Sequence, residues 1–230
     1  VDVRTVSADV ADPEAMAEVF ENMAKDGPPL AGIIHAANVY DDDYLAQMSE
    51  DAFRRVFDPK ALGAWNLHRL SLSTPLDFFV MYGSISATLG NPGQGNYVAA
   101  NGFLSGLSGL RKARGLTVLT VNWGAIADVG FLARNAEVEA QLKETGIHPL
   151  DPDAALDLLG ELIINEQGEV SVARVQWSAW RGATGTGKSP RLGELSSGDD
   201  DGQGGQGQHY PLLEILQGTP LKKRRQVIEV

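Results

Sequence analysis

The chain has 230 residues, of which 43% are hydrophobic, so it can bury one sizeable core and carry an appendage. Its formal net charge of -11 argues against a nucleic-acid partner, and the absence of cysteine excludes disulfides, thiolate metal sites and thiol nucleophiles. No apolar run of about 18 residues and no charged-then-apolar opening segment occurs, so we expect no membrane span and a cytoplasmic location.

Predicted strands and helices alternate from the start of the chain to about residue 180. Runs rich in β-branched and aromatic residues predict strands at 3–10, 32–37, 76–82, 116–122 and 170–177. Apolar residues at helical spacing predict helices that begin near residues 12, 49, 94 and 152. Asp12 is the expected N-cap of the first helix. Pro59 is expected to break the second, because proline removes a helical hydrogen bond.

This alternation predicts an α/β fold, a doubly wound parallel sheet of the Rossmann type with right-handed crossovers. Functional groups are then expected beyond the C-terminal ends of the strands. Residues 1–181 form the predicted domain. Residues 182–208 are mostly Gly, Ser, Asp and Gln and predict a disordered linker. Residues 209–230 regain apolar and basic side chains, which indicates the start of a further domain.

Two short motifs in the predicted linker imitate nucleotide-binding loops. Residues 182–189 (GATGTGKS) match the Walker A pattern, and residues 202–207 (GQGGQG) match G-x-G-x-x-G. A phosphate-binding loop needs a helix N-terminus directly after it, and no helical pattern follows either segment. We therefore interpret both as chance matches in low-complexity sequence.

Four polar residues form a candidate proton-transfer site. Tyr97 and Asn101 are four residues apart, so a helix places both on one face. Ser84 ends the most apolar predicted strand, and Lys60 follows Pro59. The pKa of a free tyrosine is about 10, and a nearby ammonium lowers it. Serine can hydrogen-bond a substrate carbonyl, and asparagine can support a lysine or a relay water. Taken alone, each residue is more typical of packing or of a solvated surface.

Four blocks of the sequence resemble the core of polyketide synthase ketoreductases, a branch of the short-chain dehydrogenases. The blocks are HAANVYDDDYLAQMS, DPKALGAWNLH, DFFVMYGSISATLGNPGQGNYVAANGFL and VNWGAI, and the similarity covers about residues 3–180. This branch replaces Y-x-x-x-K by Y-x-x-x-N and carries its lysine upstream, as Tyr97, Asn101 and Lys60 do here. The resemblance implies that Tyr97 donates the proton and Ser84 aligns the ketone. It also implies that Lys60 contacts the cofactor ribose and tunes Tyr97, with Asn101 in support.

The resemblance implies NADPH as the hydride source and no metal. The implied cofactor contacts, besides Lys60, are Asp9, Val10, Ala36, Ala37, Trp123 and Gly124. Trp123 is almost equally typical of a core residue. Asn38 stands where the family has glycine, a change that keeps left-handed backbone accessible. The family's glycine-rich first turn is expected before Val1, so we expect this chain alone to bind NADPH poorly. Residues 129–146 match the family's lid over the substrate.

The resemblance also implies a substrate and a stereochemical outcome. The substrate is expected as a β-ketoacyl thioester on the phosphopantetheine of an acyl carrier protein, with other synthase domains in the same polypeptide. The implied substrate-orienting residues are Asp41, Asp42, Leu89, Pro92 and Asn96. Leu89 stands where one stereochemical class has tryptophan. The other class carries an L-D-D triplet, from which residues 40–42 depart only at Tyr40. We therefore expect B-type reduction, which gives the D-hydroxyl.

Two other functions stay open at this point. A degenerate reductase fold would serve as a non-catalytic spacer between domains, and a stand-alone dehydrogenase would act on a small free alcohol. The intact Lys60, Ser84, Tyr97 and Asn101 argue against the spacer. The displaced lysine argues against the stand-alone enzyme, and so do residues 209–230, which resemble the start of an acyl carrier protein.

Overall fold

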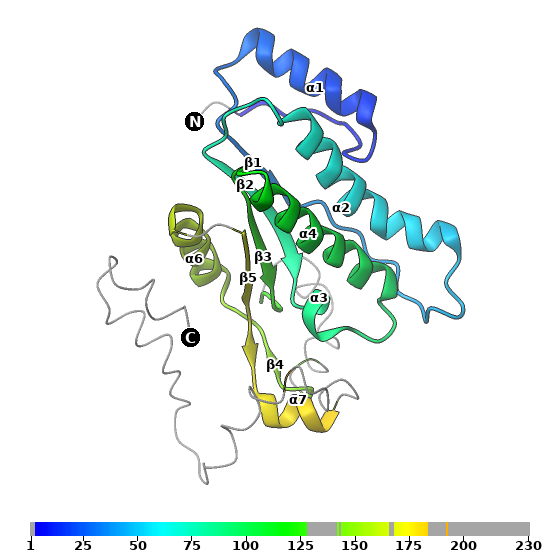
Figure 1. Cartoon of the computed structure of the whole chain (residues 1–230). Helices are drawn as coiled ribbons and strands as arrows, with labels where there is room; N and C mark the ends of the chain where they lie inside the picture. The colour runs from blue at the N-terminus through cyan, green and yellow to red at the C-terminus, as the bar shows by residue number, and fades with distance from the viewer. Residues whose placement is uncertain (1–2, 128–141, 143, 166–167, 184–191, 193–230) are drawn as a thin grey trace.

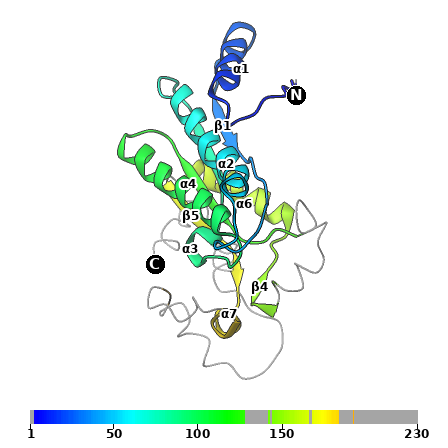
Figure 2. The ribbon, with the colours of Figure 1, turned by 90° about the vertical axis from the view of Figure 1, so that its right-hand side faces the viewer.

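The computed structural model describes residues 3–127, 142, 144–165, 168–183 and 192 (Figure 1). Its centre is a parallel sheet in the order β1-β2-β3-β5, formed by β1 (Gly32–His35), β2 (Phe78–Ser84), β3 (Leu119–Trp123) and β5 (Gly168–Val172). The long helices are α1 (Pro13–Asp26), α2 (Glu50–Leu70), α4 (Gly95–Ala113) and α6 (Pro152–Asn165). Helices α1, α2 and α4 cover one face of the sheet and α6 covers the other (Figure 1 and Figure 2). The predicted doubly wound α/β fold is confirmed.

Strand β2 contributes side chains to two hydrophobic cores, one on each face of the sheet. Phe79 and Met81 pack with Leu104 of α4 on one face, and Val80 packs with Leu159 of α6 on the other. A parallel strand with both faces covered has no polar side to show to water. This is why the segment around β2 is the most apolar predicted strand of the sequence.

The starts of α1 and α2 follow the capping signals of the sequence. The side chain of Asp12 accepts hydrogen bonds from the backbone N–H groups of Glu14 and Ala15, and Ser49 accepts one from Ala52. Each cap satisfies N–H groups that the first turn of a helix leaves without a partner. Both predicted helix starts are confirmed.

Pro59 lies inside α2, which continues unbroken through it, so the predicted break is wrong. A proline at this position costs the helix the hydrogen bond to the carbonyl of Arg55. On either side of it α2 buries Val56 and Lys60 and packs along α4. Tertiary packing of this kind supplies most of a helix's stability, and here it outweighs the local loss.

Residues 3–10 do not form the predicted strand. Val3 and Val6 are exposed, and no strand among the described residues pairs with this segment. An extended segment without a hydrogen-bonded neighbour is not a strand, whatever its β propensity. Strand β1 is only partly buried. It lies at the edge of the sheet and leaves Ile34 52% exposed.

The predicted strand at 170–177 is divided. Its first part is β5, and a short second strand β6 (Arg174–Val175) pairs antiparallel with β4 (Ile147–His148). Trp177 then begins helix α7 (Trp177–Ala183). The apolar residues at the end of this segment belong to a small hydrophobic cluster. In it Trp180 packs against Leu89 at the end of α3 (Ser86–Leu89).

Most of the predicted linker and the whole of residues 209–230 lie outside the described residues. Within 182–208 the structure describes the last two residues of α7 and Leu192, which is buried in the cluster with Leu89 and Trp180. Helix α7 thus includes the first two residues of the Walker-like segment, and the G-x-G-x-x-G match at 202–207 falls outside the described part. Among the helices that the structure describes, none is long and apolar enough to cross a membrane.

Candidate active site

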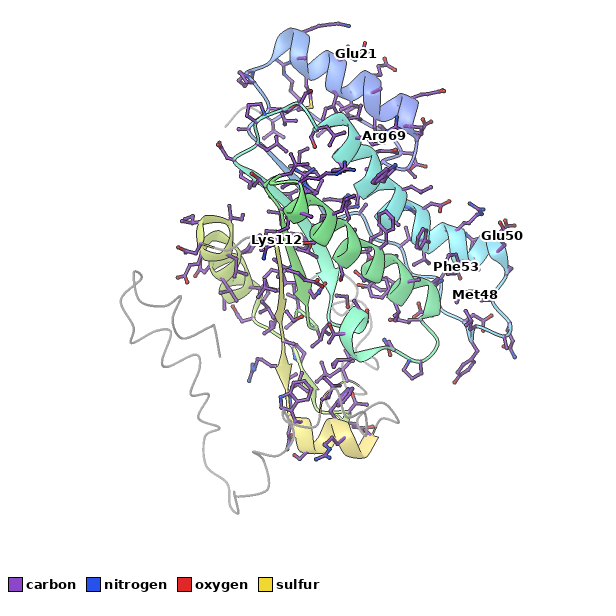
Figure 3. The ribbon with its side chains drawn as sticks, in the orientation of Figure 1. Glu21, Met48, Glu50, Phe53, Arg69 and Lys112 are labelled. Atoms are coloured by element: carbon purple, nitrogen blue, oxygen red, sulfur yellow. The ribbon has the colours of Figure 1, made fainter. Side chains whose placement is uncertain are left out.

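The four candidate catalytic residues meet where the C-terminal end of β2 lies beside α2 and α4. Ser84 is the last residue of β2, Tyr97 lies in the first turn of α4, and Asn101 follows one turn later. Lys60 comes from the middle of α2. Helices α2 and α4 run side by side in the same direction (Figure 3), so a residue of one can face a residue of the other. The structure thus brings together residues that are up to 41 positions apart in the sequence, from Lys60 to Asn101.

Lys60 is 3% exposed and is fixed through both its side chain and its backbone. Its Nζ donates to the carbonyl oxygen of Tyr82 at 2.9 Å and lies 5.5 Å from the ring centroid of Tyr97. Its carbonyl oxygen lies 2.8 Å from Nε2 of His35, which must donate this hydrogen bond. Burial lowers the pKa of Lys60 to about 8, which leaves its ammonium form dominant at pH 7.

Tyr97 is 8% exposed, and its pKa is raised above the ordinary value of a tyrosine. Burial is the largest cause, and the electrostatic interaction and hydrogen bond with Tyr40 act in the same direction. Hydrogen bonds with Ser84 and Asn101 act in the opposite direction. The pKa of Tyr97 is thus raised, not lowered as expected from Lys60, because burial is the largest cause. At neutral pH Tyr97 is a phenol with a proton to give.

Asn101 and Ser84 complete the polar cluster around Tyr97. Nδ2 of Asn101 donates to the carbonyl oxygen of Tyr97 at 2.8 Å, while its Oδ1 is buried and has no hydrogen-bond partner within the described residues. Oγ of Ser84 accepts a hydrogen bond from the N–H of Ser86 at 3.2 Å, which leaves its O–H to donate. A buried acceptor without a donor costs about 1–3 kcal/mol. The Asn101 oxygen is therefore an open position for a hydroxyl group of a ligand.

Residues implied for cofactor binding lie near the same end of the sheet. Ala36 and Ala37 follow β1 directly, and Ala36 is exposed. Oδ1 of Asp9 accepts from the N–H of Ala11 at 2.9 Å, and the carbonyl of Val10 accepts from Nδ2 of Asn66 at 3.0 Å. The segment before α1 is thus tied to α2. The small side chains after β1, the donors of the Lys60 ammonium and the open Asn101 oxygen fit a cofactor rich in hydroxyl groups.

Trp123 ends β3 and is followed by Gly124. Its side chain is buried in the core beneath α6, with its ring centroid 5.9 Å from that of Tyr82. This environment favours the packing role that the sequence left open. Its Nε1 has no hydrogen-bond partner among the described residues. The predicted lid at 129–146 lies mostly outside the described residues.

Asn96 binds residues 38–43, here termed the entrance loop, to the start of α4. Its Nδ2 donates to the carbonyl oxygen of Asp41 at 2.8 Å, and its Oδ1 accepts from the N–H of Tyr97 at 2.8 Å. Asn96 is fully buried. One side chain therefore joins the loop to the helix turn that carries Tyr97.

The other substrate-orienting candidates differ in whether they lie near Tyr97. Nε2 of Gln94 donates to Oδ2 of Asp42 at 2.7 Å, and Arg55 of α2 forms an ion pair with Asp41. Pro92 is exposed in the turn that carries Gln94. Leu89, in contrast, is buried against Trp180 and Leu192. The structure therefore brings Asp41, Asp42 and Asn96 together beside Tyr97 and gives Leu89 a packing partner instead.

Sequence reasoning missed three residues of this arrangement, His35, Gln94 and Arg55. His35 lies within the predicted strand 32–37 and is the last residue of β1, so it is placed at the end of the sheet where functional groups are expected. Gln94 and Arg55 act on partners 52 and 14 residues away, and no motif spacing connects them.

A parallel α/β sheet with a tyrosine, a serine, an asparagine and a lysine gathered at one end defines the short-chain dehydrogenase/reductase class. Within that class, the sequence model described as the KR domain matches residues 1–128. The chain therefore belongs to the KR family, the ketoreductase domains of polyketide synthases.

Individual relatives agree with this family. The chain is 38% identical over 163 residues to a phenolphthiocerol synthesis polyketide synthase type I of Mycobacterium marinum, a match that covers 70% of this chain and 8% of that protein. The ketoreductase from the first module of phoslactomycin biosynthesis in a Streptomyces species matches with a TM-score of 0.73 and 33% identity, over 77% of this chain and 41% of that one. A structure described as an A1-type ketoreductase matches with a TM-score of 0.72 and 31% identity, over 77% and 37%.

Proposed function

We propose that this chain is the catalytic part of a ketoreductase domain that uses NADPH to reduce a carrier-bound β-ketoacyl thioester to the β-hydroxyacyl thioester. The supporting observation is the buried cluster of Lys60, Ser84, Tyr97 and Asn101 at one end of the sheet. A spacer domain has no need of a buried lysine or of an open buried acceptor, both of which cost folding free energy. Retaining them favours catalysis over the scaffold alternative.

The proposed mechanism starts with two hydroxyl donors. Ser84 and Tyr97 hydrogen-bond the β-carbonyl oxygen and polarise it. NADPH, when bound, supplies the hydride that adds to the β-carbon. Tyr97 gives its phenolic proton to the carbonyl oxygen, which becomes the alcohol while Tyr97 becomes a phenolate. The ammonium of Lys60, 5.5 Å from the ring centroid, stabilises that phenolate.

The chain's own groups suggest how the cofactor is held. The Lys60 ammonium and the open oxygen of Asn101 are suited to ribose hydroxyls beside Tyr97. The remaining assignments rest on the family resemblance and place Asp9 and Val10 at the adenine and Ala36 and Ala37 at the cofactor turn. The segment of Trp123 and Gly124 is placed beside the nicotinamide, with the Trp123 ring itself packed in the core. NADPH is preferred to NADH on that resemblance.

We also propose B-type stereochemistry, which gives the D-hydroxyl. The hydrogen bonds from Asn96 to the Asp41 carbonyl and from Gln94 to Asp42 support it, because they hold the acidic loop against the turn before Tyr97. The fold likeness to an A1-type ketoreductase does not weigh against this, since a TM-score of 0.72 describes the backbone and not these side chains. Leu89 in place of tryptophan supports the same class.

The substrate is proposed to arrive on the phosphopantetheine of an acyl carrier protein. The chain spans 4% to 10% of the length of the matching synthases, so neighbouring synthase domains are proposed as partners in the same polypeptide. In this arrangement residues 1–181 are the reductase region, 182–208 the linker and 209–230 the start of the next domain. A cytoplasmic location is proposed with it.

A cofactor-oxidation assay tests the proposed function. The full-length protein that contains this chain is mixed with NADPH and an unbranched β-ketoacyl pantetheine thioester, and loss of NADPH fluorescence is followed with NADH and a simple free ketone as controls. We expect oxidation with NADPH and the thioester. No oxidation would favour the scaffold, and faster oxidation with the free ketone would favour the stand-alone dehydrogenase.

A further inference from the structure

Tyr40 lies against the candidate proton donor. Its ring centroid is 5.1 Å from that of Tyr97, with the two planes inclined by 41°. The two phenols also interact through a hydrogen bond. Tyr40 occupies the first position of the triplet in which the B-type family pattern has leucine, a residue that has no hydroxyl group. The contact is therefore a feature of this chain's own sequence.

The backbone around Tyr40 is held in place. The carbonyl of Asp41 accepts from Asn96, and the N–H of Asp43 donates to the carbonyl of Gly93 at 2.9 Å. The contact between the two phenols thus comes from a loop anchored on the same helix turn that carries Tyr97. An anchored contact of this kind limits the rotations open to the Tyr97 ring.

The two tyrosines differ in their access to water. Tyr97 is 8% exposed, whereas Tyr40 is 37% exposed. The other groups that face Tyr97 are Lys60 from α2, Ser84 from β2 and Asn101 from α4 itself. Lys60 and Asn101 are buried and Ser84 is only partly exposed, so Tyr40 is the most exposed proton-bearing group of the cluster.

We propose that Tyr40 is a positioning residue that orients the Tyr97 hydroxyl and returns a proton to it from solvent after each reduction. The proposal rests on the proposed ketoreductase function. After Tyr97 gives its proton to the substrate oxygen, the O–H of Tyr40 passes its proton to the Tyr97 phenolate. Tyr40 then takes a proton from water. One solvent proton is used per turnover and no electrons move between the tyrosines.

The electrostatics of the pair set the sign of a pH effect. Tyr40 acts with burial to raise the pKa of Tyr97, and the acid must be protonated to work. Activity is therefore present below the pKa of Tyr97 and is lost above it. Removing the Tyr40 hydroxyl lowers that pKa, so the alkaline fall in kcat moves to lower pH. Lys60 loses its proton near pH 8 in both proteins, which gives a first fall that the variant leaves unchanged. The fall that moves is the later one, at which Tyr97 loses its proton.

The test is Tyr40→Phe in the full-length protein, which removes one oxygen atom and keeps the ring. We expect kcat with the β-ketoacyl pantetheine thioester to fall about two- to tenfold, the effect of one hydrogen bond, with KM little changed. We also expect the alkaline fall in kcat to move to lower pH. Tyr44→Phe is the matched control, since it removes the same atom from a side chain that is 68% exposed, and it should leave both readouts unchanged.

The outcomes separate this proposal from the proposed function. An inactive wild-type protein overturns both. If the wild type is active, Tyr97→Phe is inactive, and Tyr40→Phe keeps the wild-type kcat and pH profile, then only the role of Tyr40 is overturned. A fall in kcat without a shift of the alkaline limb shows a merely structural role and also overturns it. Tyr40→Leu, which restores the family residue, should show the same shift as Tyr40→Phe.

Discussion

At the scale of single residues, burial shifts the pKa values of Tyr97 and Lys60 in opposite directions. It raises the pKa of Tyr97 and lowers the pKa of Lys60 to about 8, because low-dielectric surroundings disfavour the charged form of each. The phenol is thereby kept protonated while the lysine still carries its charge at pH 7. An acid beside a cation is the combination that a ketone reduction needs, since the phenolate it leaves behind is stabilised by the cation.

Tyr97→Phe should cut the rate of β-ketoacyl thioester reduction by roughly two to four orders of magnitude, the usual effect of losing a general acid. Only one hydroxyl is lost, so NADPH binding should change little. Turnover by the full-length variant and fluorescence titration with NADPH measure the two effects. Retention of more than about a tenth of the wild-type rate would contradict the assignment of Tyr97 as donor.

Some of these residues were predictable and others were not. The i,i+4 spacing of Tyr97 and Asn101 and the strand-end position of Ser84 follow from local patterns, and the family resemblance adds Lys60. The contact of Tyr40 with Tyr97 and the bond from His35 to the Lys60 carbonyl join segments 57 and 25 residues apart. No local rule links such segments, because the sheet and the loops between its strands bring them together only in the folded chain.

At the scale of elements, apolar periodicity and capping predict the secondary structure of most segments. The exceptions are caused by contacts with distant parts of the chain. Helix α2 passes through Pro59 because its buried side packs along α4. Residues 3–10 have strand propensity but no described partner strand. Trp177, assigned to a strand by its apolar neighbours, begins α7 instead. Local propensity decided none of these three cases, since pairing and packing with distant segments override it.

The entrance loop and the turn before α4 form one unit, joined by hydrogen bonds to Asp41, Asp42 and Asp43. The side chain of Gln94 takes part in two of its hydrogen bonds, donating to Asp42 and accepting from Asn91 at 2.7 Å. A substrate that passes this unit meets a surface whose shape these bonds maintain. The unit is therefore the element in which we place control of the substrate's orientation.

Asp42→Ala should erode the stereoselectivity of reduction, because it removes the carboxylate that holds Gln94 and that we expect to guide the acyl chain. Chiral chromatography of the product from an unbranched β-ketoacyl thioester gives the ratio of D- to L-hydroxy product. We expect mostly D product from the wild type and a mixture from the variant. Gln94→Ala should act in the same direction, since it removes the other half of the hydrogen bond.

Asp157→Ala is the matched control for this experiment. Asp157 is an exposed carboxylate on α6, which covers the opposite face of the sheet, and its loss should leave the D to L ratio unchanged. Mostly L product from the wild type would contradict the proposed B-type stereochemistry. An unchanged ratio in Asp42→Ala would show that the loop does not guide the substrate.

At the scale of the whole molecule, a buried histidine connects the edge of the sheet to α2, the helix that carries Lys60. His35, the last residue of β1, is 3% exposed and donates to the carbonyl of Lys60 in α2 at 2.8 Å. Its side chain also lies beside Gly63, where a larger residue would collide with the ring and with Val10. The sheet, the segment before α1 and α2 therefore meet around Gly63, and burial keeps the His35 ring neutral at pH 7.

The stability of the fold should consequently depend on pH below neutrality. Burial lowers the pKa of His35 from 6.5 to about 4, a shift that the hydrogen bond to the Lys60 carbonyl opposes and the Lys60 charge reinforces. Between these two values the unfolded chain binds a proton at His35 and the folded chain does not. The contribution of neutral His35 to the free energy of unfolding is thus fully present above about pH 6.5. It decreases by about 3 kcal/mol as the pH falls towards 4.

His35→Gln separates this effect from the general acid sensitivity of the protein. Glutamine keeps an N–H donor for the Lys60 carbonyl but does not titrate in this range. We expect the free energy of unfolding of the wild type to fall more steeply than that of His35→Gln between pH 6.5 and 4. Hydrogen exchange of peptides from β1 and α2 in the full-length protein measures it locally, with α6 peptides as the internal reference. Parallel pH dependence in the two proteins would show that His35 titrates in the folded state much as it does in the unfolded chain, and that the ring is not the point at which acid loosens the active site.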